Sequence, residues 1–205
     1  MAEPLLVPEQ EKGGGSETSH SVEFPDDLTA RNAFGTFKRR LLDVNRWQEY
    51  AGSGTASFQL TDEEGNRLDR PAQKADRFCI DVPGPGSKAG NGCDWVAVDA
   101  IEQTGSDTGE MIAMRVRPVE NPLNDTNDVA HFFSAEATST FSIIREGRVI
   151  TAAVHGRNEK PNLETEKLRD RVRNAVVATG AILGLNKPQW KALVTGLLEF
   201  KPDTD

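Results

Sequence analysis

The sequence predicts an α+β fold: an antiparallel sheet of about six strands, arranged as a meander that curls towards a half-barrel, with an N-terminal helix and a C-terminal helical pair. Apolar and polar residues alternate in short runs between Thr55 and Gly156, as they do in half-buried strands. No helical pattern long enough for a crossover separates these runs, so neighbouring strands should be antiparallel. Amphipathic helical patterns occur only at the two ends of the chain.

The segment from Thr138 to Gly156 gives the strongest strand signal. Two β-rich runs flank Glu146-Gly147, and a two-residue loop ending in Gly is typical of a hairpin. This loop predicts the opposing pairs Arg145–Arg148, Ile143–Ile150, Phe141–Ala152 and Thr138–His155. One face would then carry the apolar side chains and the other the polar ones. The predicted apolar face holds Ser139, Phe141, Ile143, Ile150, Ala152 and Val154, and the polar face holds Thr138, Thr140, Ser142, Thr151 and His155.

The remaining elements follow from shorter patterns. Four further strands are expected at 55–61, 76–82, 95–101 and 111–117, with a polar turn at 104–109 between the last two. Before them, Asp27 can cap a helix that runs to about Tyr50. The apolar stripe of this helix comprises Phe34, Phe37, Leu41 and Val44.

Two helices are expected after the sheet. Asn162 can cap a helix to about Leu183. Asn186 begins a second one, with Gln189 completing a capping box and Pro188 in the first turn, where its missing N–H costs nothing. The stripe of the second helix, within 186–200, comprises Trp190, Leu193, Val194, Leu197 and Leu198.

Residues 1–26 read as a disordered, acidic tail rich in Gly, Pro and Ser, and residues 27–202 as a single α+β domain. The net charge is −8, and residues 1–27 alone account for −6 of it. A nearly neutral body without a basic stripe argues against a nucleic acid partner. No run of about 18 apolar residues exists for a membrane span, and the N-terminus lacks the features of a secretory signal, so a cytoplasmic location is expected.

Cys79 and Cys93 could approach each other across a hairpin. In a reducing compartment, however, free buried thiols are the expected state. Two thiols alone do not make a zinc site, which needs four ligands.

No cofactor or metal is expected from the motifs. Gly84, Gly86 and Ala89 match a dinucleotide fingerprint, but that fingerprint needs a helix to begin at once, and Gly90-Asn91-Gly92 prevents it. We therefore expect a long hairpin connection there, with an anion nest near Lys88 as the alternative.

Five residues are candidates for a ligand site. His131, His155 and Glu159 would form an acid/base or metal cluster if the segment carrying His131 crossed the mouth of the sheet, although their spacing matches no zinc or iron signature. Arg115 and Arg117 share a strand face, where an acidic ligand or the chain's own tail could meet them. The alternative for all five is an ordinary solvated or hydrogen-bonded side chain.

The order of elements resembles that of helix-grip (START-like) domains, which bind hydrophobic ligands. The chain departs from that pattern in two respects: the usual strand before the first helix is missing, and a second C-terminal helix is added. The resemblance is one of fold, since no motif matches.

Three functions follow as hypotheses. The first is a non-enzymatic binding module, with an apolar pocket between the sheet and the C-terminal helices for a small hydrophobic ligand. The second is a protein-interaction module that forms a homo-oligomer through the 186–200 helix. The third is a metal-dependent or acid/base hydrolase at His131, His155 and Glu159. No nucleophile motif supports an enzyme.

Overall fold

The computed structural model of the protein describes residues 6–81, 93–124, 133–160 and 179–199. Seven strands form one sheet in the order β1-β7-β6-β5-β4-β3-β2, and every neighbouring pair is antiparallel. The sheet is open, because β1 and β2 lie at separate edges. The predicted fold class is confirmed, with one strand more than expected. The strands are β1 (Gly14–Glu23), β2 (Ser57–Thr61), β3 (Arg77–Asp81), β4 (Asp94–Gly105), β5 (Gly109–Pro118), β6 (Thr138–Glu146) and β7 (Val149–Glu159).

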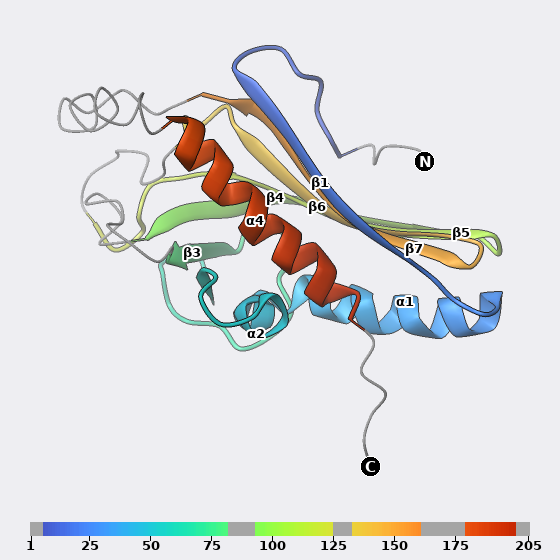
Figure 1. Ribbon diagram of the computed structural model, residues 1–205. Coiled ribbons are helices and arrows are strands. Elements are labelled where there is room, and N and C mark those ends of the chain that lie inside the picture. Colours follow the sequence, from blue (N-terminus) through green and yellow to red (C-terminus); the bar gives the residue numbers. More distant parts are fainter. Residues whose placement is uncertain (1–5, 82–92, 125–132, 161–178, 200–205) are drawn as a thin grey trace.

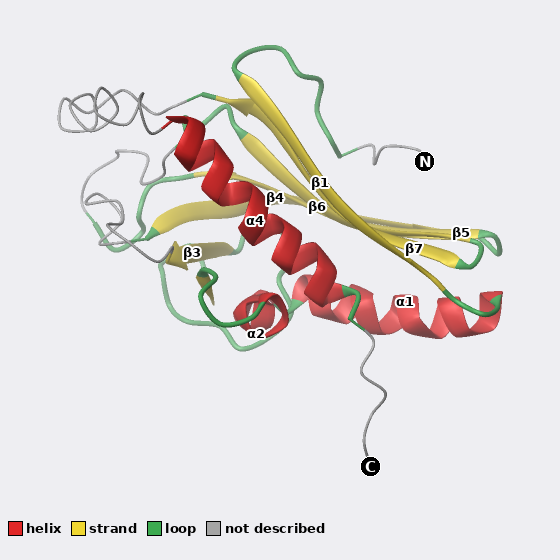
Figure 2. Cartoon of the chain, in the orientation of Figure 1, coloured by secondary structure: helices red, strands yellow, loops and turns green. Residues whose placement is uncertain are grey.

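The helices cover one face of this sheet (Figure 1, Figure 2). They are α1 (Asp27–Leu42), the 3-10 turn η1 (Val44–Arg46), α2 (Trp47–Ala51) and α4 (Thr179–Leu197). We call the face that they cover the inner face and the opposite one the outer face. The long helix α4 crosses the inner face beside β1 and β7.

Strand β1 corrects the prediction that residues 1–26 form a structureless tail. Residues Gly14–Glu23 pair along β7, with Glu17 opposite His155 and Glu23 opposite Val149. This is the strand that the helix-grip comparison lacked. Its strand signal in the sequence is weak because most of its side chains are polar, and only Thr18 and Val22 are of the β-branched kind enriched in strands.

The β6–β7 hairpin has the predicted faces but a different register. Its two-residue turn is Gly147-Arg148, with Gly147 at a φ of +56°, and Ile143 lies opposite Ala152 rather than Ile150. The register therefore differs by two residues from the prediction. A shift of two keeps every side chain on its own face, so the predicted separation of apolar and polar residues holds.

The helix ends differ from their predicted positions. Asp26, one residue earlier than expected, caps α1 by accepting a hydrogen bond from the Thr29 amide at 2.7 Å. The helix also ends early, at Leu42, and the chain continues through η1 into α2. At the C-terminus the expected break at Asn186 does not occur, because α4 continues through Pro188. Of the helix expected at 162–183, residues 162–178 lie outside the described residues.

The core is centred on Trp47, which is fully buried between α1 and the sheet. Its ring lies 4.7 Å from that of Phe141, 5.1 Å from Phe58 and 5.9 Å from Phe78. Its indole N–H donates to the carbonyl groups at the end of α1, so its one polar atom is satisfied. Trp190 packs on the other side of Phe141, at 5.3 Å. Trp95, in contrast, lies on the outer face next to β3.

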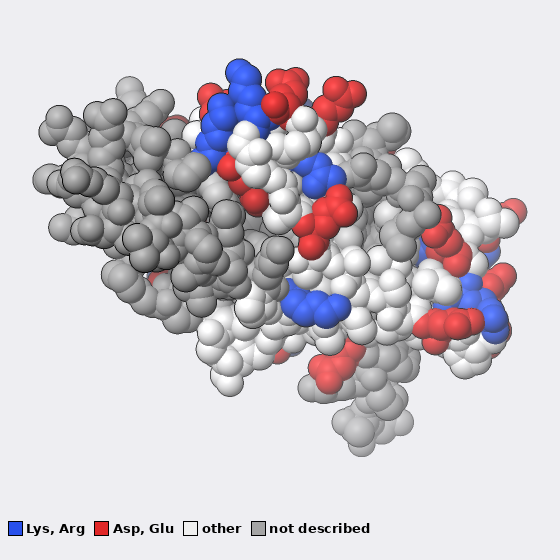
Figure 3. All heavy atoms as spheres, turned by 45° about the horizontal axis from the view of Figure 1, so that its top comes forward, with Lys and Arg blue, Asp and Glu red and all other residues white. Residues whose placement is uncertain are grey.

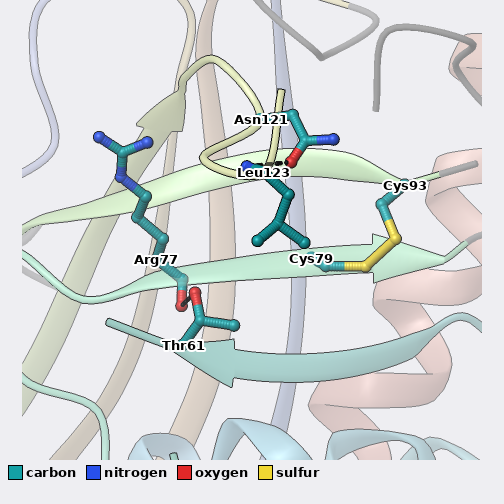
Figure 4. Close-up of a disulfide and its surroundings, with 6 residues drawn as sticks. All are labelled: Thr61, Arg77, Cys79, Cys93, Asn121 and Leu123. Atoms are coloured by element: carbon teal, nitrogen blue, oxygen red, sulfur yellow. Dashed lines mark hydrogen bonds between the residues drawn. A yellow bond between two sulfur atoms is a disulfide. The ribbon is translucent and has the colours of Figure 1, made fainter. Parts of the chain in front are cut away.

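The two cysteines are bonded, which corrects the prediction of free thiols. Cys79 on β3 and Cys93 just before β4 form a disulfide with a Cα–Cα distance of 5.4 Å (Figure 4). The antiparallel pairing of Cys79 with Trp95 brings the start of β4 beside β3 and makes this link geometrically simple. Disulfides are typical of oxidising compartments, so the bond does not support the expected cytoplasmic location.

Within the described ranges, no helix combines the length and the apolar character that a membrane crossing requires.

Candidate functional site

A row of polar side chains crosses the outer face of the sheet. In register, Arg115 on β5 lies opposite Thr140 on β6, Thr140 opposite His155 on β7, and His155 opposite Glu17 on β1. The row therefore brings together two of the five predicted site residues, Arg115 and His155. In the view of Figure 3, the Lys and Arg side chains of the described residues lie interspersed with Asp and Glu side chains.

The arginines of this row are bound to the protein itself. Arg115 forms an ion pair with Asp99 at 2.6 Å, and its Nη1 atom donates to the Leu6 carbonyl at 3.2 Å. Arg117 lies 3.6 Å from the same carboxylate but is more than half exposed. The N-terminal segment thus meets Arg115, as the sequence suggested for the chain's own tail.

At the other end of the row, Glu17 is held by Arg157 and lies next to His155. Arg157 donates to its Oε1 atom at 2.7 Å, and His155 Nδ1 lies 3.5 Å from that atom. The hydrogen bond from Arg157 lowers the pKa of Glu17, and the contact with His155 acts in the same direction. Glu17 is therefore a carboxylate at neutral pH. It was assigned to the tail in the sequence, so the sequence offered no reason to pair it with His155.

Glu159 does not join this row. Its carboxylate accepts a hydrogen bond from Ser16 at 2.9 Å, whereas His155 lies next to Glu17. Ser16 and Glu17 are adjacent in β1 and point to opposite faces, so Glu159 and His155 are separated by the sheet. The predicted cluster of His131, His155 and Glu159 is therefore wrong for its last two members, and His131 lies outside the described residues. A group of three potential metal ligands is also absent among the described residues.

A small enclosed gap lies on the inner face, at the end of the sheet away from the hairpin tips. Its floor is apolar and comes from Val96 on β4 and Val116 on β5, and Phe133 and Ala137 close it. Polar residues, among them Ser139 and Glu159, complete the lining. Its volume is about 10 Å³, close to what one water molecule needs. In its present form the gap is too small for an organic ligand.

Side chains fill the space between the sheet and the helices. They include the apolar stripe of the 186–200 helix, which was predicted as an interaction face. Leu193, Val194, Leu197 and Leu198 are each at most 2% exposed, because they pack into the core beneath the sheet. Oligomerisation was predicted because this stripe holds more apolar residues than a small sheet would be expected to cover. That reason is wrong, because the stripe is buried within the chain. Oligomerisation itself stays untested.

A second polar cluster, at the hairpin tips, was not predicted. Arg145 is fully buried and donates to Glu110 at 2.7 Å and to the Gly147 carbonyl at 3.1 Å. Arg31 of α1 donates to the Asp107 carbonyl beside it, at 2.9 Å. The sequence analysis placed Arg145 only opposite Arg148 and did not predict its burial. A signal existed in the alternation itself, which places residue 145 on the same face as Phe141 and Ile143.

The described residues form an open antiparallel sheet with the long helix α4 on its inner face, which is an α+β fold. The comparisons with known proteins agree at the level of fold. A hypothetical protein from Helicobacter pylori, of known structure, superposes with a TM-score of 0.53 at 12% identity, over 97% of this chain and 93% of that one. This likeness shows the fold alone.

Weaker matches include norcoclaurine synthase from Thalictrum flavum and an uncharacterized protein from Bacillus thuringiensis. Their TM-scores are 0.39 and 0.38, at 10% and 15% identity, over 95% and 91% of this chain and 100% of each of those. Matches at this level carry no functional argument. No protein-family model and no curated protein matches the sequence.

Proposed function

We propose that this protein is a non-enzymatic binding module for a small hydrophobic ligand, held at the inner-face end of the sheet. The observation that carries the proposal is the enclosed gap whose floor is Val96 and Val116 and whose cover is Phe133 and Ala137. All four side chains are buried and apolar, and polar residues, among them Ser139 and Glu159, complete the lining. Binding sites for small molecules combine such an apolar lining with a few polar groups that fix orientation.

The size of the gap sets a condition on binding. A ligand larger than water must displace the segment 133–137 that closes it. A hydrogen bond from the Ser134 N–H to the Lys160 carbonyl, at 2.9 Å, joins this segment to the residue that follows β7.

The test uses an amphipathic anionic probe, 8-anilinonaphthalene-1-sulfonate, titrated into the full chain and followed by fluorescence. Ala137→Trp fills the gap and should weaken saturable binding at least tenfold. Ala153→Trp is the matched control, since Ala153 is also a buried alanine but lies on the outer face. Thermal unfolding of both variants verifies that they fold.

Two results would remove the proposal. One is the absence of saturable binding by the folded wild-type chain. The other is equal weakening by the two tryptophan substitutions, which would place the probe elsewhere.

A further inference from the structure

Strand β1 forms one edge of the sheet and pairs with β7 on one side only. The Phe24 amide donates to the Arg148 carbonyl at 2.9 Å, so these two residues form a hydrogen-bonded pair. Backbone groups alternate along an antiparallel strand, and every second residue before Phe24 therefore also faces β7. The residues between them direct their N–H and C=O groups away from β7, and their side chains are exposed. They are Glu17, Ser19, Ser21 and Glu23.

One of these outward backbone groups has a partner in the described part of the chain. The Lys191 ammonium group donates to the Ser19 carbonyl at 2.8 Å. Helix α4 carries this lysine past β1 on the inner face of the sheet (Figure 1). Among the described residues, no other hydrogen bond reaches the outward backbone groups of β1. An edge with free backbone groups can pair with another strand, and proteins often place a lysine at such an edge to prevent it.

A second copy of this chain is the partner that fits this edge. β1 can pair antiparallel with its own counterpart about a two-fold axis, which is the commonest symmetry of soluble dimers. With the axis at Ser19, Glu17 of one copy lies opposite Ser21 of the other. In the same register, Glu23 lies opposite Gly15. No two like charges then face each other across the strands, so the side chains of β1 permit the pairing.

Lys191 opposes this pairing through its position and its charge. Its ammonium group occupies the Ser19 carbonyl, which a second strand would need as an acceptor. The two-fold axis would also bring the Lys191 side chains of both copies together, and like charges at close range repel. We propose that Lys191 keeps the free edge of β1 from pairing with β1 of a second copy. This inference does not depend on the ligand proposed above.

The test compares the self-association of Lys191→Ala and wild type, both as the full chain, by sedimentation equilibrium. Loss of the ammonium group should raise the association constant at least tenfold. Lys74→Ala is the matched control and should leave the constant unchanged, because Lys74 is also an exposed lysine but lies outside the helices and strands. Lys191→Arg should also leave it unchanged, since a guanidinium group can donate to the same carbonyl. Thermal unfolding verifies that each variant folds.

Two additions to Lys191→Ala locate the contact. Ser19→Pro should cancel the gain in association, because the Ser19 amide faces away from β7 and its loss removes no hydrogen bond within the sheet. Ser19→Cys should form a disulfide-linked dimer at least tenfold faster with Lys191→Ala than with Lys191 present. The native cysteines do not interfere, because both are in the disulfide.

The proposal is wrong if a folded Lys191→Ala chain associates no more strongly than wild type. It is equally wrong if Ser19→Pro leaves the gain unchanged, or if Ser19→Cys cross-links at the same rate with and without Lys191. The cross-linking rate decides the question by itself should Ser19→Pro fail to fold.

Discussion

At the scale of single residues, the most unusual feature is a guanidinium group buried without solvent. Arg145 is enclosed at the hairpin tips, while its partner Glu110 keeps about a quarter of its side chain exposed. Because of this difference in exposure, Glu110 should tolerate the loss of Arg145 better than Arg145 tolerates the loss of Glu110. A lone buried cation is costly, whereas a partly exposed carboxylate can be hydrated.

We therefore expect Glu110→Ala to cost about 3 kcal/mol of unfolding free energy and Arg145→Met about 1 kcal/mol. The methionine fills most of the arginine's volume and needs no charged partner. Urea unfolding at neutral pH measures both values. Combining Arg145→Met with Glu110→Leu should give a protein close to wild type, and a loss larger than that of Glu110→Ala would contradict this account.

The Glu17 carboxylate gives a prediction about pH. Because its pKa is lowered in the folded protein, chiefly by the hydrogen bond from Arg157, the folded state favours the ionised form. The resulting stability is present above the pKa of the unfolded state, about 4.3 for Glu, and is lost as the pH falls through the lower folded value.

Glu17→Gln should therefore lower stability at pH 7 by less than about 1 kcal/mol, since the side chain is largely exposed to solvent. The difference from wild type should disappear below the folded pKa. Thermal unfolding between pH 7 and pH 3 measures it. A difference that stayed constant over this range would mean that the ion pair is not its cause.

At the scale of elements, β1 decides where the folded unit begins. It covers the edge of β7 along nine residue pairs, and α4 supports it, since Lys191 donates to the Ser19 carbonyl at 2.8 Å. Without β1 the edge of β7 would present unpaired backbone groups to other chains.

Two truncations test whether β1 is an essential strand or a dispensable tail. Removal of residues 1–13 should leave a folded, cooperative protein, because it spares β1. Removal of residues 1–23 should cause loss of cooperative unfolding and aggregation, seen by calorimetry and light scattering. If the shorter chain stays folded and monodisperse, β1 is dispensable and the boundary predicted near residue 27 would be the right one.

At the scale of the whole molecule, the disulfide ties the short strand β3 to the main sheet. Cys79 and Cys93 are 14 residues apart, and closing a loop of this length in the unfolded chain stabilises a protein by about 3 kcal/mol. A reductant should therefore lower the melting temperature by about 10 °C.

The double variant Cys79→Ser with Cys93→Ser provides the control, since its melting temperature should not respond to reductant. Thiol titration of the denatured wild-type chain without reductant should find no free thiol. Two free thiols in the chain isolated from its own cell would show that the bond does not form there.

The candidate sites were harder to predict than the fold because they depend on which strands are neighbours. Arg115 and His155 were singled out from the sequence, but Glu17, Asp99 and Glu110 were not. Asp99 meets Arg115 across the β4–β5 pair, and Glu110 meets Arg145 across the β5–β6 pair. Glu17 meets its partners only because β1 pairs with β7, more than 100 residues away in the chain. The gap beneath Phe133 arises in the same way, from a loop that closes on two central strands.

The sequence alone determined the α+β class, the faces of the strands and the apolar stripes, because side-chain periodicity is a local property that follows from backbone geometry. Only the tertiary structure decided that a polar segment becomes an edge strand, that Arg145 and the stripe of α4 are buried, and that His155 and Glu159 lie on opposite sides of the sheet. These outcomes depend on contacts between residues far apart in the chain, where packing and hydrogen bonding override local preference.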